Sequence, residues 1–112
     1  MQRLKDPNHL ELLALVAMAR LGDTAYGVTI RQEIMTVTAR DVSMAAVYAA
    51  LDRLERHRFV TPWWSEPRAE RGGRARRQYR LTADARAWLR RERETTLRMW
   101  RGVTFDAGGR GR

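Results

Sequence analysis

The order of the predicted elements places this chain of 112 residues in the mainly α (α+β) class, as a winged helix-turn-helix. Three segments with apolar residues at helical spacing come first. Two short segments rich in β-branched and aromatic residues follow, and a loop rich in arginine and glycine separates them. A fourth helical segment comes after the second strand. Three helices followed by a strand, a basic loop and a strand make up a winged helix.

The first helix is predicted from Pro7 to Leu21, with Asp6 as its cap and Gly22 as its end. Pro7 suits the first turn, because the amide hydrogen that proline lacks would have no partner there. Apolar residues cover most of the circumference of this helix, so it must be buried on two sides. A chain this short builds a single core, and we therefore expect the second side to meet another protomer.

The next two helices form the predicted helix-turn-helix. Thr24 is expected to cap a helix at Ala25–Val37, and Ser43 is expected to cap the helix that begins at Met44. Apolar residues recur at helical spacing in both helices. The expected core residues are Val28, Ile30, Ile34, Val47, Ala50, Leu51 and Leu54.

The strands are predicted at Phe59–Ser65 and at 77–81, and Pro62 favours an edge strand because it has no amide donor. Thr82 is expected to cap a fourth helix, Ala83–Arg101. The chain then divides into a winged helix-turn-helix domain, residues 1–81, a C-terminal helix, residues 82–101, and a tail, residues 102–112, that we expect to be disordered.

The positive charge is concentrated in one part of the chain. Residues 1–66 contain eight basic and eight acidic side chains, whereas residues 67–112 contain fourteen basic and five acidic ones. The whole net charge of +9 therefore lies in the second segment. Such an asymmetry favours a polyanionic partner, either nucleic acid or an anionic surface.

Other classes of protein find little support in the sequence. The chain has no cysteine and two histidines, and it contains no metalloprotease, phosphate-loop or nucleophile-elbow motif. We therefore expect no enzyme activity, no cofactor and no metal site. No apolar run approaches the roughly 18 residues of a membrane span, and no signal-peptide pattern is present, so the expected location is the cytoplasm.

Four segments resemble the PadR family of bacterial transcription regulators. They are “LLAL” at 12–15, “YGVTIRQEI” at 26–34, “SMAAVYAALDRLERHRFVT” at 43–61 and “GRARRQYRLTADA” at 73–85. The resemblance covers residues 10 to about 90 and implies a DNA-binding regulator, most often a repressor. The single C-terminal helix resembles the short branch of the family, whose members are dimers, so we expect a homodimer on a pseudo-palindromic operator of double-stranded DNA.

The candidate DNA contacts lie in the third helix and in the wing. The arginines of the wing can bind phosphates, and its glycines allow close approach of the backbone. The helix exposes small apolar residues that can meet thymine methyl groups, and Tyr48 and Arg53 are its polar candidates. Packing against the neighbouring helix is the alternative for Tyr48, and stacking on the core is the alternative for Tyr26. The candidates are Tyr26, Ser43, Met44, Ala45, Ala46, Tyr48, Arg53, Arg71, Gly73, Arg74, Arg76 and Arg77.

The helix of the third segment also departs from the family pattern. Met44 and Ala45 stand where the family usually has proline and glycine, and Asp52 stands where it often has a basic residue. Ala46 and Ala49 replace the usual threonine and proline. Direct readout of bases therefore looks sparse, and we expect DNA shape and half-site spacing to contribute to specificity.

The first and fourth helices are expected to form the dimer. The candidate interface residues are Leu10, Leu13, Ala17, Ala85, Trp88, Leu89, Thr96, Leu97 and Trp100. In relatives of the short branch, flat aromatic or drug-like effectors enter a cleft between the paired C-terminal helices. By that resemblance Thr96 and Trp100 are the candidate effector residues, although residues at such spacing are more often simple core or interface.

Two alternatives to sequence-specific DNA binding remain at the level of the sequence. One is a protein-interaction module in which the basic wing meets an acidic partner. The other is a non-specific polyanion binder, in which the arginine-rich fourth helix meets a membrane surface or RNA. The arginines of that helix are spread round its circumference, which argues against an amphipathic membrane helix.

Overall fold

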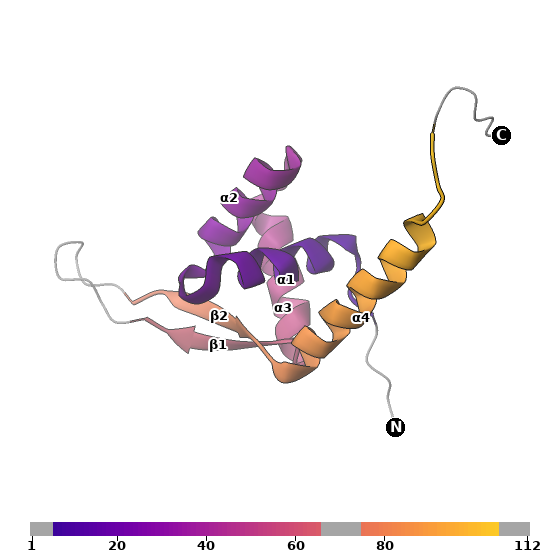
Figure 1. The fold of residues 1–112 in the computed structure, drawn as a ribbon. Coiled ribbons are helices and arrows are strands. Elements are labelled where there is room, and N and C mark those ends of the chain that lie inside the picture. Colours follow the sequence, from indigo (N-terminus) through magenta and orange to yellow (C-terminus); the bar gives the residue numbers. More distant parts are fainter. Residues whose placement is uncertain (1–5, 66–74, 106–112) are drawn as a thin grey trace.

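The computed structural model of the chain describes residues 6–65 and 75–105 (Figure 1). These residues confirm the predicted winged helix-turn-helix, with four helices and a two-stranded antiparallel sheet. A short 3-10 turn, η1, joins the first two helices. The elements are α1 (His9–Leu21), η1 (Gly22–Thr24), α2 (Gly27–Thr38), α3 (Met44–Arg56), β1 (Val60–Trp64), β2 (Arg77–Leu81) and α4 (Ala83–Trp100).

The predicted cap of α1 is wrong, whereas its predicted end is confirmed. Asn8, not Asp6, caps the helix: its side-chain oxygen accepts a hydrogen bond from the backbone N–H of Glu11 at 2.8 Å. The Glu11 carboxylate accepts one from the N–H of Asn8, also at 2.8 Å, which completes a capping box. At the other end Gly22 adopts a φ of 61°, and its N–H reaches the carbonyl of Met18.

The start of α2 also differs from the prediction, because the sheet uses the preceding residues. The N–H of Tyr79 in β2 donates to the carbonyl of Ala25 at 2.9 Å, and Tyr26 forms an isolated bridge with Gln78. Ala25 and Tyr26 are therefore extended, and the helix begins only at Gly27. Thr24 does not cap it. Its hydroxyl instead donates to the carbonyl of Leu21 at 2.8 Å.

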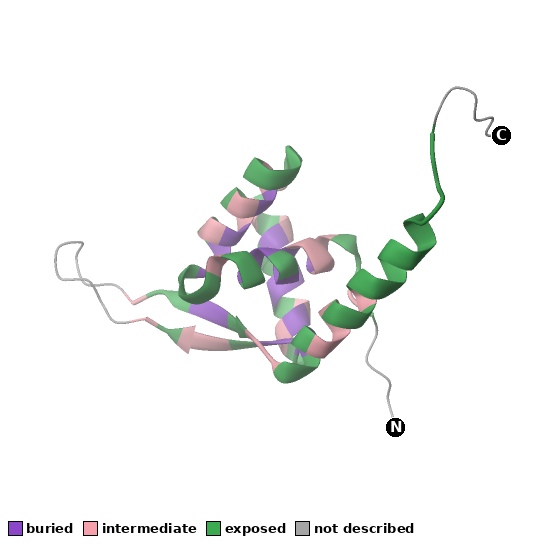
Figure 2. Cartoon of the chain, viewed as in Figure 1, coloured by how far each residue is buried: buried purple, intermediate pink, exposed green. Residues whose placement is uncertain are grey.

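Helices α1, α2 and α3 enclose the core, which appears in purple in Figure 2. Six of the seven core residues predicted in α2 and α3 are buried, which confirms the helical periodicity there. Val28 is the exception, with 43% of its surface exposed on the outer side of α2. The side chain of Arg31 ties the α2–α3 connection to the core by donating to the carbonyl of Val42 at 2.6 Å.

The wing and the last helix extend from this core in different directions (Figure 1). Strands β1 and β2 pair from Val60 opposite Leu81 to Trp64 opposite Arg77, so Pro62 lies in a two-stranded sheet as predicted. Thr82 caps α4 as predicted, by accepting from the N–H of Ala85 at 3.1 Å. Within the described residues, no helix combines the length and the apolar character that crossing a bilayer requires.

Substitution of Ala39 by glycine should stabilise the fold. Ala39 ends α2 at a φ of 59° and a ψ of 18°, a left-handed conformation that is unfavourable for a residue with a Cβ atom. We expect Ala39→Gly to raise the free energy of unfolding by about 0.5–1 kcal/mol. The same change at exposed Ala49, inside α3, should lower it by about 1 kcal/mol. Urea unfolding of both variants checks the opposite signs, and a loss of stability in both would contradict the strain at Ala39.

Candidate nucleic-acid interface

Predicted contact residues from three separate elements meet beside the start of α2. The guanidinium of Arg76, next to β2, is hydrogen-bonded to the hydroxyl of Tyr26 and lies 4.6 Å from the centre of its ring. Tyr48 of α3 approaches the same place, beside Gly27. These residues line an open hollow of about 530 Å³. Its lining consists of Tyr26, Gly27, Val28, Tyr48, Arg76, Arg77 and Tyr79.

The position of Tyr48 depends on the absence of a side chain at Gly27. A Cβ atom at Gly27 would lie 2.5 Å from Cε1 of the Tyr48 ring and 2.9 Å from its hydroxyl oxygen, both too close for packing. Tyr48 therefore packs against α2, yet 52% of its surface remains exposed. The two roles considered for Tyr48 are thus compatible. Sequence reasoning did not select Gly27 as a site residue, and its one signal was a glycine in the first turn of a helix.

Near the N-terminal end of α3, the remaining exposed surface is small and apolar, as the sequence predicts. The hydroxyl of Ser43 accepts a hydrogen bond from the N–H of Ala46 at 3.0 Å, which confirms Ser43 as the cap. Met44 and Ala46 are half-buried, whereas Ala45 is exposed. Toward the N-terminal end of the helix, the outward face has one large side chain with a polar end, that of Tyr48. The whole face consists of Ala45, Tyr48, Ala49, Asp52 and Arg56, all exposed.

Arg53, the second polar candidate in α3, is tied to α1. Its guanidinium forms an ion pair with the carboxylate of Glu11, which is 6% exposed. The same carboxylate belongs to the capping box of α1, so one acid fixes both the start of α1 and the side of α3. The contact assigns Arg53 a structural role in this conformation. Sequence reasoning missed Glu11, because an acid in a first helical turn is common for capping alone.

Arg77, predicted to bind phosphate, is tied to α3 in the same way. Its two terminal nitrogens donate to the two carboxylate oxygens of Glu55 at 3.0 Å each, and one of them also donates to the hydroxyl of Tyr79 at 2.8 Å. The hydrogen bonds to Glu55 raise the pKa of Arg77 above its ordinary value, although burial acts in the opposite direction. A two-point pair of this kind fixes orientation as well as distance. It therefore joins the base of the wing to α3.

The described arginines of the predicted interface thus differ in the charge that surrounds them. Arg53 and Arg77 each have a carboxylate partner, whereas none lies within ion-pair distance of Arg76 in the residues that the structure describes. Arg76 is exposed, and its guanidinium lies against the neutral ring and hydroxyl of Tyr26. The other predicted wing contacts, Arg71, Gly73 and Arg74, lie outside the described residues.

The predicted dimer residues separate into two groups. Ala17 and Ala85 are 3% and 0% exposed in the core of the chain itself, and Trp88 packs edge-on against Phe59 with 5.9 Å between ring centres. Ala17 and Ala85 therefore face inward and leave no surface for a partner, which corrects their prediction as interface residues, whereas Trp88 is half-buried and stays a prediction. The sequence pattern did not separate these cases, because small and aromatic residues on a helix do not reveal which partner covers them. Leu10, Leu13 and Leu89 are half-buried against the core, and Thr96, Leu97 and Trp100 are exposed.

An apolar groove of about 430 Å³ runs between α1 and α4. Thr96 lines it together with apolar residues such as Val16 and Leu97, but Trp100 does not. The ring of Trp100 instead makes an edge-on contact with Phe105, 5.9 Å between centres, beyond the end of α4. The groove that Thr96 lines therefore does not include the other candidate effector residue, Trp100.

Comparison with protein families identifies the chain. Residues 15–91 match the model of the transcriptional regulator PadR-like family, which is well over half of the chain. No curated protein matches this sequence significantly.

Solved structures show the same fold at low sequence identity. A PadR family transcription regulator from Clostridium difficile is 22% identical, with 84% of this chain and 88% of that chain covered and a TM-score of 0.64. A PadR-like transcription factor from Bacteroides fragilis is 22% identical, with 80% and 82% covered and a TM-score of 0.65. The protein smu.1704 from Streptococcus mutans is 21% identical, with 95% and 100% covered and a TM-score of 0.66.

Substitution of Gly27 by alanine should reveal its contact with Tyr48. We expect Gly27→Ala to destabilise the fold by about 1–3 kcal/mol, because the new methyl group overlaps the Tyr48 ring. In a Tyr48→Ala background the overlap is gone and alanine is the better helix former, so the same change should be neutral or stabilising. Thermal unfolding of the four proteins of this cycle measures the difference. Equal effects of Gly27→Ala in both backgrounds would contradict the proposed contact.

Proposed function

This chain belongs to the PadR-like family of transcriptional regulators, and from that premise we propose that it is a homodimeric, sequence-specific DNA-binding repressor. The observation that carries the proposal is the surface formed by Tyr26, Tyr48 and Arg76. It joins the start of α2, the exposed face of α3 and the base of the wing. A helix-turn-helix protein contacts DNA with these same parts.

In the proposed complex α3 lies in the major groove. Its small outward residues, such as Ala45 and Ala49, allow close approach and can contact thymine methyl groups. The exposed hydroxyl of Tyr48 offers a hydrogen bond to a phosphate or base edge. Arg76, which has no carboxylate partner among the described residues, would contact a phosphate beside Tyr26. Arg71 and Arg74 of the wing would extend these contacts along the backbone.

The proposed dimer uses exposed apolar residues in the second half of α4. Leu97, Met99 and Trp100 are 57%, 74% and 53% exposed, which leaves an apolar surface near the end of the helix. Pairing two such surfaces about a twofold axis presents two α3 helices to the DNA. The expected operator is then pseudo-palindromic, with half-sites about one helical turn apart.

An aromatic or drug-like effector would enter where the two α4 helices pair, near Thr96 and Trp100. The exposed ring of Trp100 offers a surface for stacking. By changing the angle between the two α3 helices, such a ligand would release the DNA.

The first experiment is fluorescence anisotropy with the DNA upstream of the coding sequence and with a scrambled duplex, at several salt concentrations. Sequence-specific binding predicts an affinity about a thousandfold higher for the native duplex. Arg76→Ala should weaken binding to both duplexes alike and reduce the slope of log K against log salt by about 0.9 per protomer. Arg91→Ala, which removes the same charge from exposed α4, is the control. Equal affinity for both duplexes would leave only non-specific polyanion binding.

Glu55 should limit the charge that the wing base offers to DNA. Glu55→Gln would free Arg77 for phosphate, so we expect tighter binding to all sequences and a salt slope steeper by about 0.9 per protomer. Glu33→Gln provides the matched control, since it makes the same charge change at the pair with Arg20, outside the proposed DNA surface. If both variants change the slope equally, Arg77 is not withheld by Glu55 and only the overall charge matters.

A further inference from the structure

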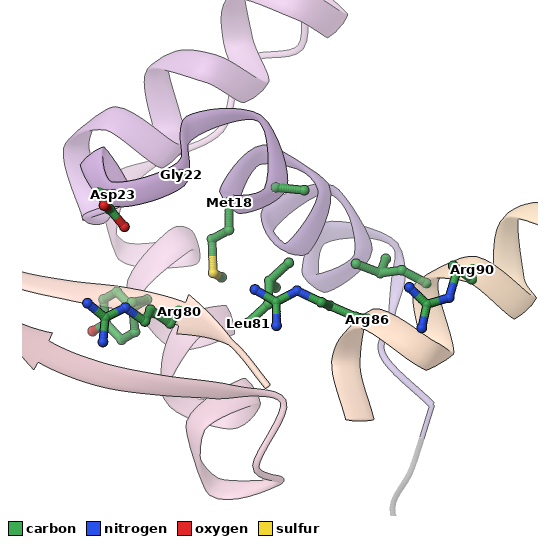
Figure 3. Close-up of a pocket in the computed structure, with 10 residues that line it drawn as sticks. Met18, Gly22, Asp23, Arg80, Leu81, Arg86 and Arg90 are labelled. Atoms are coloured by element: carbon green, nitrogen blue, oxygen red, sulfur yellow. The ribbon is translucent and has the colours of Figure 1, made fainter. Parts of the chain in front are cut away.

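Two adjacent tryptophans end strand β1, and the functions proposed so far use neither of them. Trp63 and Trp64 point to opposite faces of the sheet, because successive side chains of a strand alternate. Trp63 is half-buried under the guanidinium of Arg80, which lies 4.4 Å from its ring centre. Figure 3 shows Arg80 at a groove between the end of α1, β2 and α4. Trp64 is 64% exposed, although tryptophan is on average a highly buried residue, so its exposure needs an explanation.

Trp64 lies on the face of the sheet that is turned toward α3. It pairs with Arg77 across the two strands, and the side chains of directly opposite residues share one face. Arg77 reaches from that face to Glu55 of α3 through two hydrogen bonds of 3.0 Å. Tyr48, about two turns before Glu55, lines the same hollow as Arg77. Through Arg77, Trp64 therefore adjoins the proposed DNA surface.

The backbone around Trp64 is held by the pairing of the two strands. The N–H of Ser65 donates to the carbonyl of Arg76 at 2.9 Å, and the N–H of Arg76 donates to the hydroxyl of Ser65 at 3.0 Å. The pairing thus continues one step beyond Trp64 and Arg77. Because this backbone is already ordered, a partner that binds at Trp64 does not have to order it.

We propose that Trp64 packs on the sugar–phosphate backbone of the DNA, next to the phosphate that Arg76 contacts. This inference rests on the proposed DNA binding. The indole ring offers a flat apolar surface to the deoxyribose carbons, and its Nε1–H can donate to a phosphate oxygen. Such a contact carries no charge, so it adds affinity for every sequence without releasing counterions. Trp64 thus supplies affinity that salt does not screen, beside the salt-sensitive contact of Arg76.

The test repeats the anisotropy titrations with Trp64→Ala. This change should weaken binding to the native and scrambled duplexes alike, about tenfold, and leave the slope of log K against log salt unchanged, in contrast to Arg76→Ala. Thermal unfolding without DNA should change little, because the side chain is exposed. Wild-type affinity or an altered salt slope in Trp64→Ala would overturn this inference alone. A wild-type protein that binds neither duplex would overturn the proposed DNA binding as well.

Tryptophan fluorescence then locates the contact. Trp64→Phe and Trp63→Phe make the same change on the two faces of β1 and form a matched pair. Bound DNA should reduce acrylamide quenching in the wild type and in Trp63→Phe, and this protection should be largely absent in Trp64→Phe. Equal protection in the two variants would overturn the proposal. So would quenching without DNA that is the same in the wild type and in Trp64→Phe, because a second protomer would then already cover Trp64.

Discussion

The pairing of two backbone segments far apart in sequence determines how the parts of this molecule meet. Ala25 and Tyr26, just before α2, bond to Gln78 and Tyr79 of β2. Because this pairing fixes the start of α2 against the wing, Tyr26 lies beside Arg76, and Gly27 lies under the ring of Tyr48. This pairing and these contacts thus join the helix-turn-helix to the wing. A loss of this pairing would therefore disturb the relative positions of α2, α3 and the wing in the proposed DNA surface.

Two acidic side chains determine which arginines of that surface are already paired within the chain. Glu11 forms an ion pair with Arg53 and joins α1 to α3, and Glu55 forms one with Arg77 and joins α3 to β2. Both pairs are partly exposed, so orientation is their main contribution and net stability is secondary. A neutralised arginine adds little to the long-range attraction of phosphates. Among Arg53, Arg76 and Arg77, the arginine that would contribute most to the field that meets DNA is therefore Arg76.

Elements and core were predictable from the sequence because they depend on local periodicity and capping. Ser43 and Thr82 cap their helices as expected, since a hydroxyl before an apolar helical pattern has few competing roles. The prediction that Thr24 caps α2 was wrong because a non-local strand pairing displaced the start of this helix. The prediction that Ala17 and Ala85 lie in the dimer interface was wrong for a different reason. Periodicity identifies a buried face of a helix but not whether the same chain or a partner covers it. The partners of Arg53 and Arg77 are 42 and 22 residues away in sequence, beyond any local pattern.

The last helix presents the strongest physical argument for a second protomer. All 18 residues of α4 are described, and Ala85 alone among them is buried. A helix of this length is only marginally stable in water unless an apolar face is packed. Its first half packs on the core through Trp88 and Leu89, but Leu97, Met99 and Trp100 in its second half are exposed. Burial of these side chains against a twofold-related copy would stabilise the helix and set the spacing of the two α3 helices at the same time. In the proposed dimer, the stability of α4 and the spacing of the two α3 helices on DNA therefore depend on the same interface.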